Sequence, residues 1–147
     1  MDYNSLIRTA YFQLLNGNVV LNAVPVPVYD AEALNTSVYP YIILSTQTNT
    51  SSYSKNNLGS VHTIVVDIIT GFTGAVKSSD RDSIAEQIYS IVRPSRYGIS
   101  ISSFNTSQAQ ILSSRLVSDT TMDMQNDVYK ILRRILTFSH IIKQKTF

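Results

Sequence analysis

Few side chains in this sequence have the type and spacing that catalysis or metal binding would need. Its two histidines, His62 and His140, each lack a second histidine or a carboxylate at the spacing of metal ligands. Cysteine is absent, which excludes disulfides, thiolate metal sites and thiol nucleophiles. The many serines stand outside any G-x-S-x-G motif, the turn that presents a nucleophilic serine in many hydrolases. We therefore expect no catalytic residue, no metal and no cofactor, and a protein that is not an enzyme.

Asp80 and Asp82 are the two residues that most resemble a pair of catalytic carboxylates. They follow Ser78 and Ser79 at the start of a predicted helix. A serine there can cap the helix, and carboxylates in the first turn oppose the positive end of the helix dipole. We favour this structural interpretation over acid–base catalysis. The nearby segment 71–74 (GFTG) lacks the third glycine and the lysine of phosphate-binding loops, so nucleotide binding is not supported.

The composition favours a folded protein that works through protein contacts rather than through charge. Hydrophobic residues make up 44% of the 147 residues and charged residues 15%, below the roughly 25% of an average globular protein. Serine, threonine and asparagine must therefore supply much of the polar surface. The net charge of +2 differs from the clustered positive charge of a nucleic-acid-binding domain. The length leaves room for one domain.

The N-terminal segment and the apolar runs bear on localisation. Residues 1–5 lack the basic start and the apolar stretch of a signal peptide. No apolar run approaches the roughly 20 residues that span a bilayer. We expect a protein without a membrane partner, kept in the cytoplasm or in whatever assembles there.

Two segments carry apolar residues at helical spacing, which predicts helices over 4–15 and 79–92. Asn4 or Ser5 can cap the first helix, and residues 16–18 (Asn-Gly-Asn) would end it. Pro94 would end the second. The apolar positions are Leu6, Ile7, Ala10, Tyr11, Leu14 and Leu15 in the first helix, and Ile84, Ala85, Ile88, Ile91 and Val92 in the second.

The remaining segments indicate an extended arm and five strands. The arm covers 19–29, where Pro25 and Pro27 restrict it to an edge strand or an unpaired extended segment. Apolar and β-branched residues predict strands at about 40–48, 61–70, 99–104, 110–118 and 129–142. The polar segments 49–60 and 119–127 are interpreted as exposed loops.

The last strand is the hardest to assign, because residues 128–136 would also suit a helix; we favour a strand from about Tyr129. Together these elements predict an α+β fold in which two amphipathic helices pack on one face of a mostly antiparallel mixed sheet.

Two further features concern binding. The C-terminal segment is locally basic, with Lys130, Arg133 and Arg134 followed by Lys143 and Lys145. It is either a solvated or subunit-facing strand or, alternatively, the wall of a channel that faces DNA. The sequence also holds nine tyrosines, a residue type that is enriched at protein interfaces.

In the order of its elements the chain resembles the tail-completion and tail-terminator proteins of tailed bacteriophages. The shared features are a helix that ends near residues 15–17 (Leu-Asn-Gly), a proline-containing arm, a strand that begins Tyr39-Pro40-Tyr41, and a polar hairpin followed by a strand and a helix. The chain departs from the family around 66–70 (VDIIT), where the tryptophan and glycine-rich signature is missing, so a more distant connector protein of a short-tailed phage stays open.

The resemblance implies a virion protein, assembled in the host cytoplasm, that forms a ring at the head–tail junction. Its partners would be further copies of itself, neighbouring connector or tail proteins, and DNA passing through the lumen, with Lys130, Arg133 and Arg134 as the lumen-facing candidates. A ring needs two different contact surfaces on each subunit. The alternatives are a small enzyme or ligand-binding domain and a nucleic-acid-binding domain that uses 130–145. The interface candidates are Val26, Tyr29, Tyr53, Lys55, Asn56, Asn57, Met122 and Met124.

Overall fold

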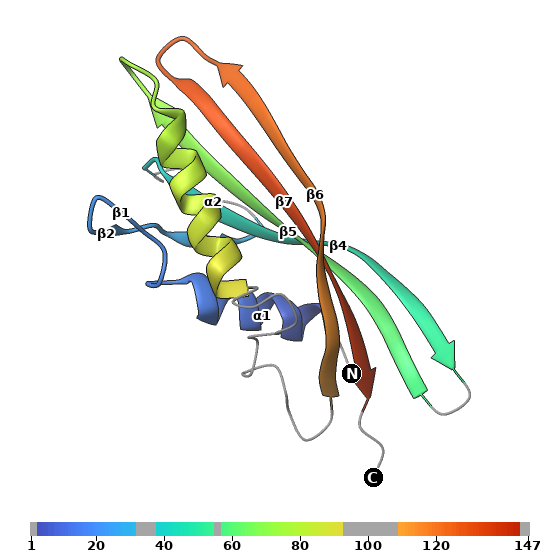
Figure 1. The fold of residues 1–147 in the computed structure, drawn as a ribbon. Helices are drawn as coiled ribbons and strands as arrows, with labels where there is room; N and C mark the ends of the chain where they lie inside the picture. The colour runs from blue at the N-terminus through green and yellow to red at the C-terminus, as the bar shows by residue number, and fades with distance from the viewer. Residues whose placement is uncertain (1–2, 32–37, 55–56, 93–108, 145–147) are drawn as a thin grey trace.

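The protein has an α+β fold, and its described residues form two helices, a mixed five-stranded sheet and a small two-stranded antiparallel sheet (Figure 1). The computed structural model describes residues 3–31, 38–54, 57–92 and 109–144. The large sheet has the strand order β3-β4-β5-β7-β6. The elements are α1 (Tyr3–Leu15), β1 (Val20–Leu21), β2 (Val24–Pro25), β3 (Val28–Asp30), β4 (Tyr41–Ser54), β5 (Asn57–Phe72), α2 (Ser78–Val92), β6 (Ala109–Gln125) and β7 (Lys130–Gln144).

Both helices lie where the apolar spacing predicts them, within one residue at each end. In α1 the side chains of Ile7, Tyr11 and Leu15 are buried, one on each successive turn. The helix ends at Leu15. Gly17 follows with a positive φ of 82°, which suits a residue without a side chain, and the Asn18 side chain donates to the carbonyl of Leu14 at 2.8 Å. In α2 four residues of the apolar stripe, Ile84, Ala85, Ile88 and Val92, are likewise buried, whereas Ile91 is half-buried.

The side chains of the large sheet alternate between an inner and an outer face. The inner face, on which both helices pack, carries the buried core (Figure 1). Its residues alternate along each strand, as a period of two requires. The outer face is opposite and is only half-buried for most of its length. The inner-face core residues are Ile42, Leu44, Ile64, Val66, Ile68, Leu136, Phe138 and Ile142.

The arm at 19–29 forms two short structures. β1 and β2 make a small hairpin whose turn residues, Asn22 and Ala23, have φ of 52° and 65°. β3 then pairs in parallel with β4 at the edge of the large sheet. Pro27 comes just before β3, and its carbonyl accepts a hydrogen bond from the amide of Ile42 at 2.9 Å.

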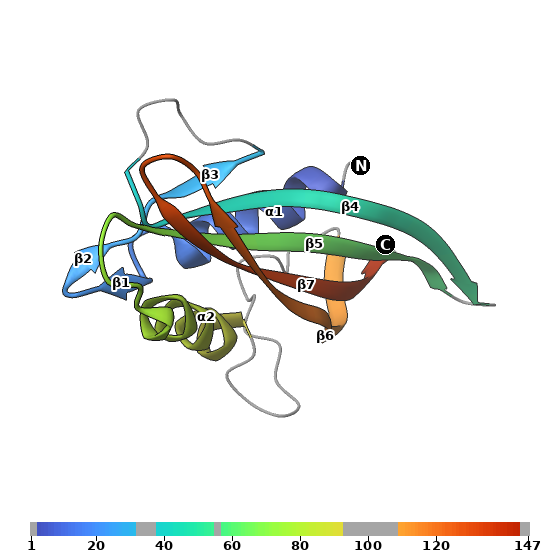
Figure 2. The ribbon, with the colours of Figure 1, turned by 90° about the horizontal axis from the view of Figure 1, so that it is seen from above.

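The two segments interpreted as loops, 49–60 and 119–127, are mostly strand, and that prediction was wrong. β4 and β5 pair from Asn49–His62 outward to Ser54–Asn57, and Figure 2 shows the two strands running side by side. β6 likewise continues to Gln125 against β7. These polar residues continue, by backbone pairing, the ladders of the neighbouring apolar segments. Hydrophobic alternation does not reveal this polar part of a strand.

The C-terminal segment is a strand, β7, from Lys130 to Gln144, close to the favoured 129–142. It lies between β5 and β6, and both of its edges are paired. The strand predicted at 99–104 lies outside the described residues.

Candidate interaction surface

A row of side chains from four strands gathers at one end of the outer face. The pairing aligns Tyr41 with Ile69, Ile69 with Arg133, and Arg133 with Met122. The neighbouring row aligns Gly71 with Ile131 and Ile131 with Met124. Met122 and Met124 are exposed, at 43% and 47%. We call this surface the outer patch; it comprises Tyr29, Tyr39, Tyr41, Ile69, Met122, Met124, Tyr129, Ile131 and Arg133.

Four tyrosines form one continuous cluster in the outer patch. The ring centroids of Tyr39 and Tyr41 are 5.4 Å apart and stacked, those of Tyr29 and Tyr41 are 5.9 Å apart and edge-on, and those of Tyr39 and Tyr129 are 5.1 Å apart. The geometries are those that aromatic pairs prefer. The cluster forms a rigid aromatic surface. Tyr29 belongs to β3 and Tyr41 to β4, whereas Tyr39 and Tyr129 come shortly before β4 and β7.

Gly71 allows this cluster to sit close to the sheet. A Cβ atom at this position would lie 2.5–2.8 Å from three ring carbons of Tyr39. The ring therefore rests directly on the backbone of β5, an approach that only glycine permits. The peptide bond between Tyr39 and Pro40 is cis.

Arg133 lies within the outer patch and is neutralised there. Its guanidinium forms an ion pair with Asp67 through two hydrogen bonds, one of them 3.3 Å from Nε to Oδ1. Hydrogen bonding to Asp67 raises the pKa of Arg133 above its ordinary value. The patch therefore has apolar and aromatic surface around a compensated charge pair, a composition typical of interface cores rather than of sites for polyanions.

Arg134 lies on the opposite face from Arg133, because successive residues of a strand alternate. Its Nε and Nη2 donate to the two carboxylate oxygens of Asp119 at 2.8 and 2.7 Å, and its Nη1 donates to Asp82 of α2 at 3.0 Å. The hydroxyl of Tyr89 donates to the same Asp119 carboxylate at 2.7 Å. This network ties α2 to β6 and β7.

The network also changes the pKa values of its members. The hydrogen bonds from Arg134 lower the pKa of Asp119, which stays a carboxylate, and raise the pKa of Arg134. Burial raises the pKa of Tyr89 to about 12, and the bond to Asp119 adds to this rise. Asp82 thus links α2 to β7 through its contact with Arg134.

Replacing Arg134 by alanine is expected to lower the free energy of unfolding by about 1–2 kcal/mol, mostly through the lost bidentate bond to Asp119. The Asp82 contact adds little, because that side chain is 55% exposed. Urea unfolding measures the loss. The control is Arg115→Ala on the same sheet, at an exposed residue, which should change the free energy by less than about 0.5 kcal/mol. Equal losses in both variants would contradict the assigned role of the network.

The structure brings some of the predicted interface residues together and separates others. Tyr29, Met122 and Met124 all lie in the outer patch, as does Arg133. Val26 is 1% exposed in the hydrophobic core, so its side chain is not offered to a partner.

The other candidates lie elsewhere. The backbones of Tyr53 and Asn57 belong to the distal end of the β4–β5 hairpin, whereas Lys55 and Asn56 lie outside the described residues. Lys130 is exposed, but alternation along β7 places it on the same face as Arg134 and not on the face of Arg133. The three basic candidates therefore do not form one surface.

Sequence reasoning missed five members of the outer patch: Tyr39, Tyr41, Ile69, Tyr129 and Ile131. Two signals could have found them. Ile69 alternates with the core residues of β5, and Ile131 alternates with those of β7, so each had to lie on the second face. That these residues are neighbours of Met122 and Met124 follows only from the strand order, in which β7 lies between β5 and β6.

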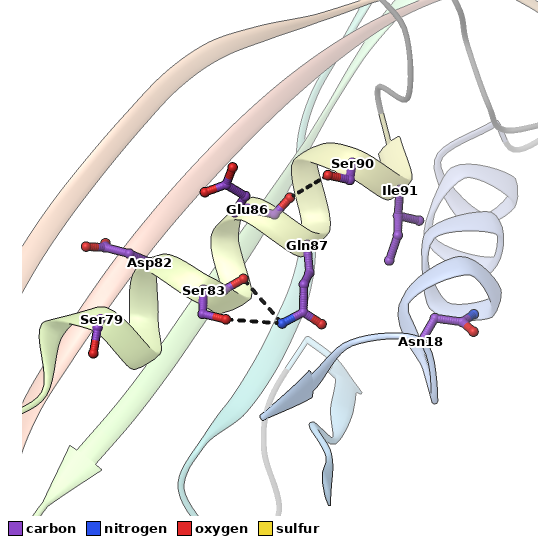
Figure 3. Close-up of a pocket in the computed structure, with 8 residues that line it drawn as sticks. All are labelled: Asn18, Ser79, Asp82, Ser83, Glu86, Gln87, Ser90 and Ile91. Atoms are coloured by element: carbon purple, nitrogen blue, oxygen red, sulfur yellow. Dashed lines mark hydrogen bonds between the residues drawn. The ribbon is translucent and has the colours of Figure 1, made fainter. Parts of the chain in front are cut away.

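A shallow groove of about 630 Å³ runs along α2, lined by residues of this helix together with Asn18 (Figure 3). Its polar side chains already have partners: the Gln87 amide donates to the carbonyls of Val20 at 2.8 Å and of Ser83 at 3.3 Å. Asp82 and Glu86 are its carboxylates, and neither histidine lies there. We find no group of three potential metal-binding side chains among the described residues, and no described helix is long and apolar enough to cross a membrane.

Comparison with known proteins gives a structural match and no sequence match. No protein-family model matches the chain, and no curated protein matches its sequence. A solved chain from the virion of a native gene transfer agent particle aligns with 93% of this chain and 94% of its own length, with a TM-score of 0.68 and 18% identity. A second solved chain, with a TM-score of 0.48 and 13% identity, is too dissimilar to support an argument. The comparison shows that the protein shares the fold of that virion chain along nearly its whole length.

Proposed function

We propose that the protein is a structural subunit of a tailed-bacteriophage virion, where it forms a ring at the head–tail junction as a tail-terminator, tail-completion or connector protein. The observation that carries the proposal is the fold shared with a chain of the gene transfer agent virion over almost the full length of both chains. The order of elements, which resembles the tail-terminator family, supports the same class.

The outer patch supplies one contact surface for such a subunit. Its tyrosines, methionines and paired arginine are the residue types that are enriched at interface cores. Its rigid aromatic side chains lose little conformational entropy when a partner binds. The proposed partners are a second copy of the chain and the neighbouring connector or tail proteins.

Contact with DNA in the ring lumen would be weak under this proposal. Arg133 and Arg134 are each paired with carboxylates, on opposite faces of the sheet. Lys130, the third basic candidate, is exposed and forms no ion pair with another described residue. We therefore expect proximity to DNA without strong binding.

The mass of the purified protein tests the proposal, measured by light scattering from low to high micromolar concentration and followed by negative-stain imaging. A discrete oligomer that images as a ring is the expected result. A protein that stays monomeric over this range and binds DNA with a steep dependence on salt would contradict the proposal and favour a nucleic-acid-binding domain.

Deleting residues 50–58 is expected to leave the fold intact and to weaken assembly. The deletion removes the distal end of the β4–β5 hairpin, and the inner-face core residues lie nearer the other end of both strands. Circular dichroism and thermal unfolding should therefore change little, while the oligomer mass falls. A deletion variant that retains the parental assembly would show that the hairpin end makes no subunit contact.

A further inference from the structure

Both edges of the large sheet are unpaired over much of their length. β6 is the last strand of the order β3-β4-β5-β7-β6, so one side of Ala109–Gln125 has no partner strand among the described residues. At the opposite edge, β3 pairs only with residues 42–44 of β4. Residues 45–54 continue β4 without a partner on that side in the part of the chain that the structure describes. Such edges carry rows of N–H and C=O groups that can pair with another strand.

The two free edges lie at the same level of the sheet. The ladders place Asn49 of β4 in one row with Ser114 of β6, and Ser52 in one row with Gln110, in each case across β5 and β7. The free part of β4, residues 45–54, is therefore level with residues 109–118 of β6. Figure 1 shows these two segments on opposite sides of the same half of the sheet.

Neither segment has the side chains that usually protect an edge from pairing. Charged residues and proline are common protective residues at natural sheet edges. Residues 45–54 (STQTNTSSYS) contain neither, and residues 109–118 (AQILSSRLVS) contain one charged residue, Arg115, and no proline. Register shifts interrupt both edges, at 46–49 in β4 and at 111–113 and 116–118 in β6. The regular stretches between them, Asn49–Ser54 and Ser113–Leu116, are free to pair.

The strand directions are compatible with pairing between copies that have the same orientation. β4, β5, β7 and β6 are each antiparallel to the next, so β4 and β6 of one copy run in opposite directions. A second copy, rotated about an axis along the strands, therefore brings its β4 antiparallel to β6 of the first. This rotation also keeps the inner faces of the two sheets on the same side.

We propose that residues 109–118 of β6 in one copy pair antiparallel with residues 45–54 of β4 in a second copy, so that the sheet continues from subunit to subunit. The contact is heterologous, because it joins two different edges, and it closes into a ring when the rotation allows. Main-chain hydrogen bonds supply the binding, as in other strand additions. The inference rests on the proposed ring and specifies how its subunits are joined.

Crosslinking of two single-cysteine variants tests the pairing, because the natural chain contains no cysteine. Asn49→Cys and Ser114→Cys are mixed at low concentration, concentrated, and treated with a short bismaleimide, which also reaches cysteines that are not directly opposite. A crosslinked dimer is expected in the mixture and not in either variant alone. No chain carries both cysteines, so every crosslink joins two copies.

Gln13→Cys mixed with Ser114→Cys is the matched control, since Gln13 is an exposed residue of α1 away from both edges. This mixture should give no crosslinked dimer above background. Equal crosslinking in the two mixtures would show random collision and would overturn the pairing.

The other outcomes separate the pairing from the ring itself. A ring that forms without the crosslink between positions 49 and 114 would overturn the strand pairing and leave the proposed ring standing. Crosslinking of Ser114→Cys alone would instead indicate a β6–β6 contact, which is isologous and closes after two copies. A protein that stays monomeric at every concentration would contradict both proposals.

Amide hydrogen exchange of the unmodified chain keeps the test decisive if a cysteine variant fails to fold. The dilute monomer is compared with the assembled protein. The amides of 45–54 and 109–118 that face the free edges should each gain at least about tenfold in protection on assembly. The amides of α2 serve as the internal reference and should change less. Assembly with no gain in these two segments, or with a gain in β6 alone, would overturn the pairing.

Discussion

Phe138→Ala is expected to lower the free energy of unfolding by about 3–5 kcal/mol, the largest stability loss that we predict for a single substitution. Phe138 is fully buried on the inner face of β7, between the two helices. Its ring lies 6.1 Å from the ring of Tyr11 in α1 and 6.1 Å from that of Tyr89 in α2. Removal leaves a cavity where three elements meet, which none of them can fill alone. Urea unfolding measures the loss.

Phe12→Ala is the matched control, because it makes the same chemical change in α1 at a side chain that is 38% exposed. This variant should lose less than about 1 kcal/mol, since it leaves no enclosed cavity and alanine favours the helix. Similar losses in the two variants would mean that Phe138 does not join the helices to the sheet as described.

Replacing Met122 and Met124 together by lysine is expected to abolish assembly without unfolding the subunit. Both side chains lie in the outer patch and are exposed in the free chain, so lysine is tolerated there. In an assembled interface each lysine would bury an unpaired charge beside Arg133, at a cost of about 2–5 kcal/mol. The dissociation constant should rise by at least about 100-fold. Light scattering measures the mass, and thermal unfolding reports the fold.

Gln13→Lys with Asn16→Lys is the charge-matched control, at one exposed position in α1 and one just after it, both away from the outer patch. This variant should assemble as the parent does. Loss of assembly in both double variants would assign the effect to net charge, whereas normal assembly of the methionine variant would exclude the outer patch as a subunit contact.

The sequence determines the helices because their signal is local. Apolar residues at 84, 85, 88 and 92 define one face of a helix whatever lies next to it, and these four are the buried residues of α2. The inner-face strands are equally local, since alternation at 64, 66 and 68 predicts a covered face. The α+β class follows from these patterns.

Polar strands could not be predicted in the same way. Residues 49–54 hold no apolar alternation, yet they extend β4, because their partners across the ladder belong to a strand that the core has already placed. Backbone pairing does not depend on side-chain polarity, so the ends of long ladders leave little trace in the sequence.

The outer patch shows most clearly what the tertiary structure decided. The sequence places Met122, Ile69 and Arg133 on three separate strands, with nothing to indicate that they are neighbours. Their alignment requires β7 to lie between β5 and β6, a strand order set by long-range packing. Alternation by itself sends Arg133 and Arg134 to opposite faces, but only the folded chain supplies Asp67 for one and Asp119 for the other. The sequence thus determined the local elements and the lack of a catalytic motif, whereas the contact surface depends on register between distant strands, which no local pattern encodes.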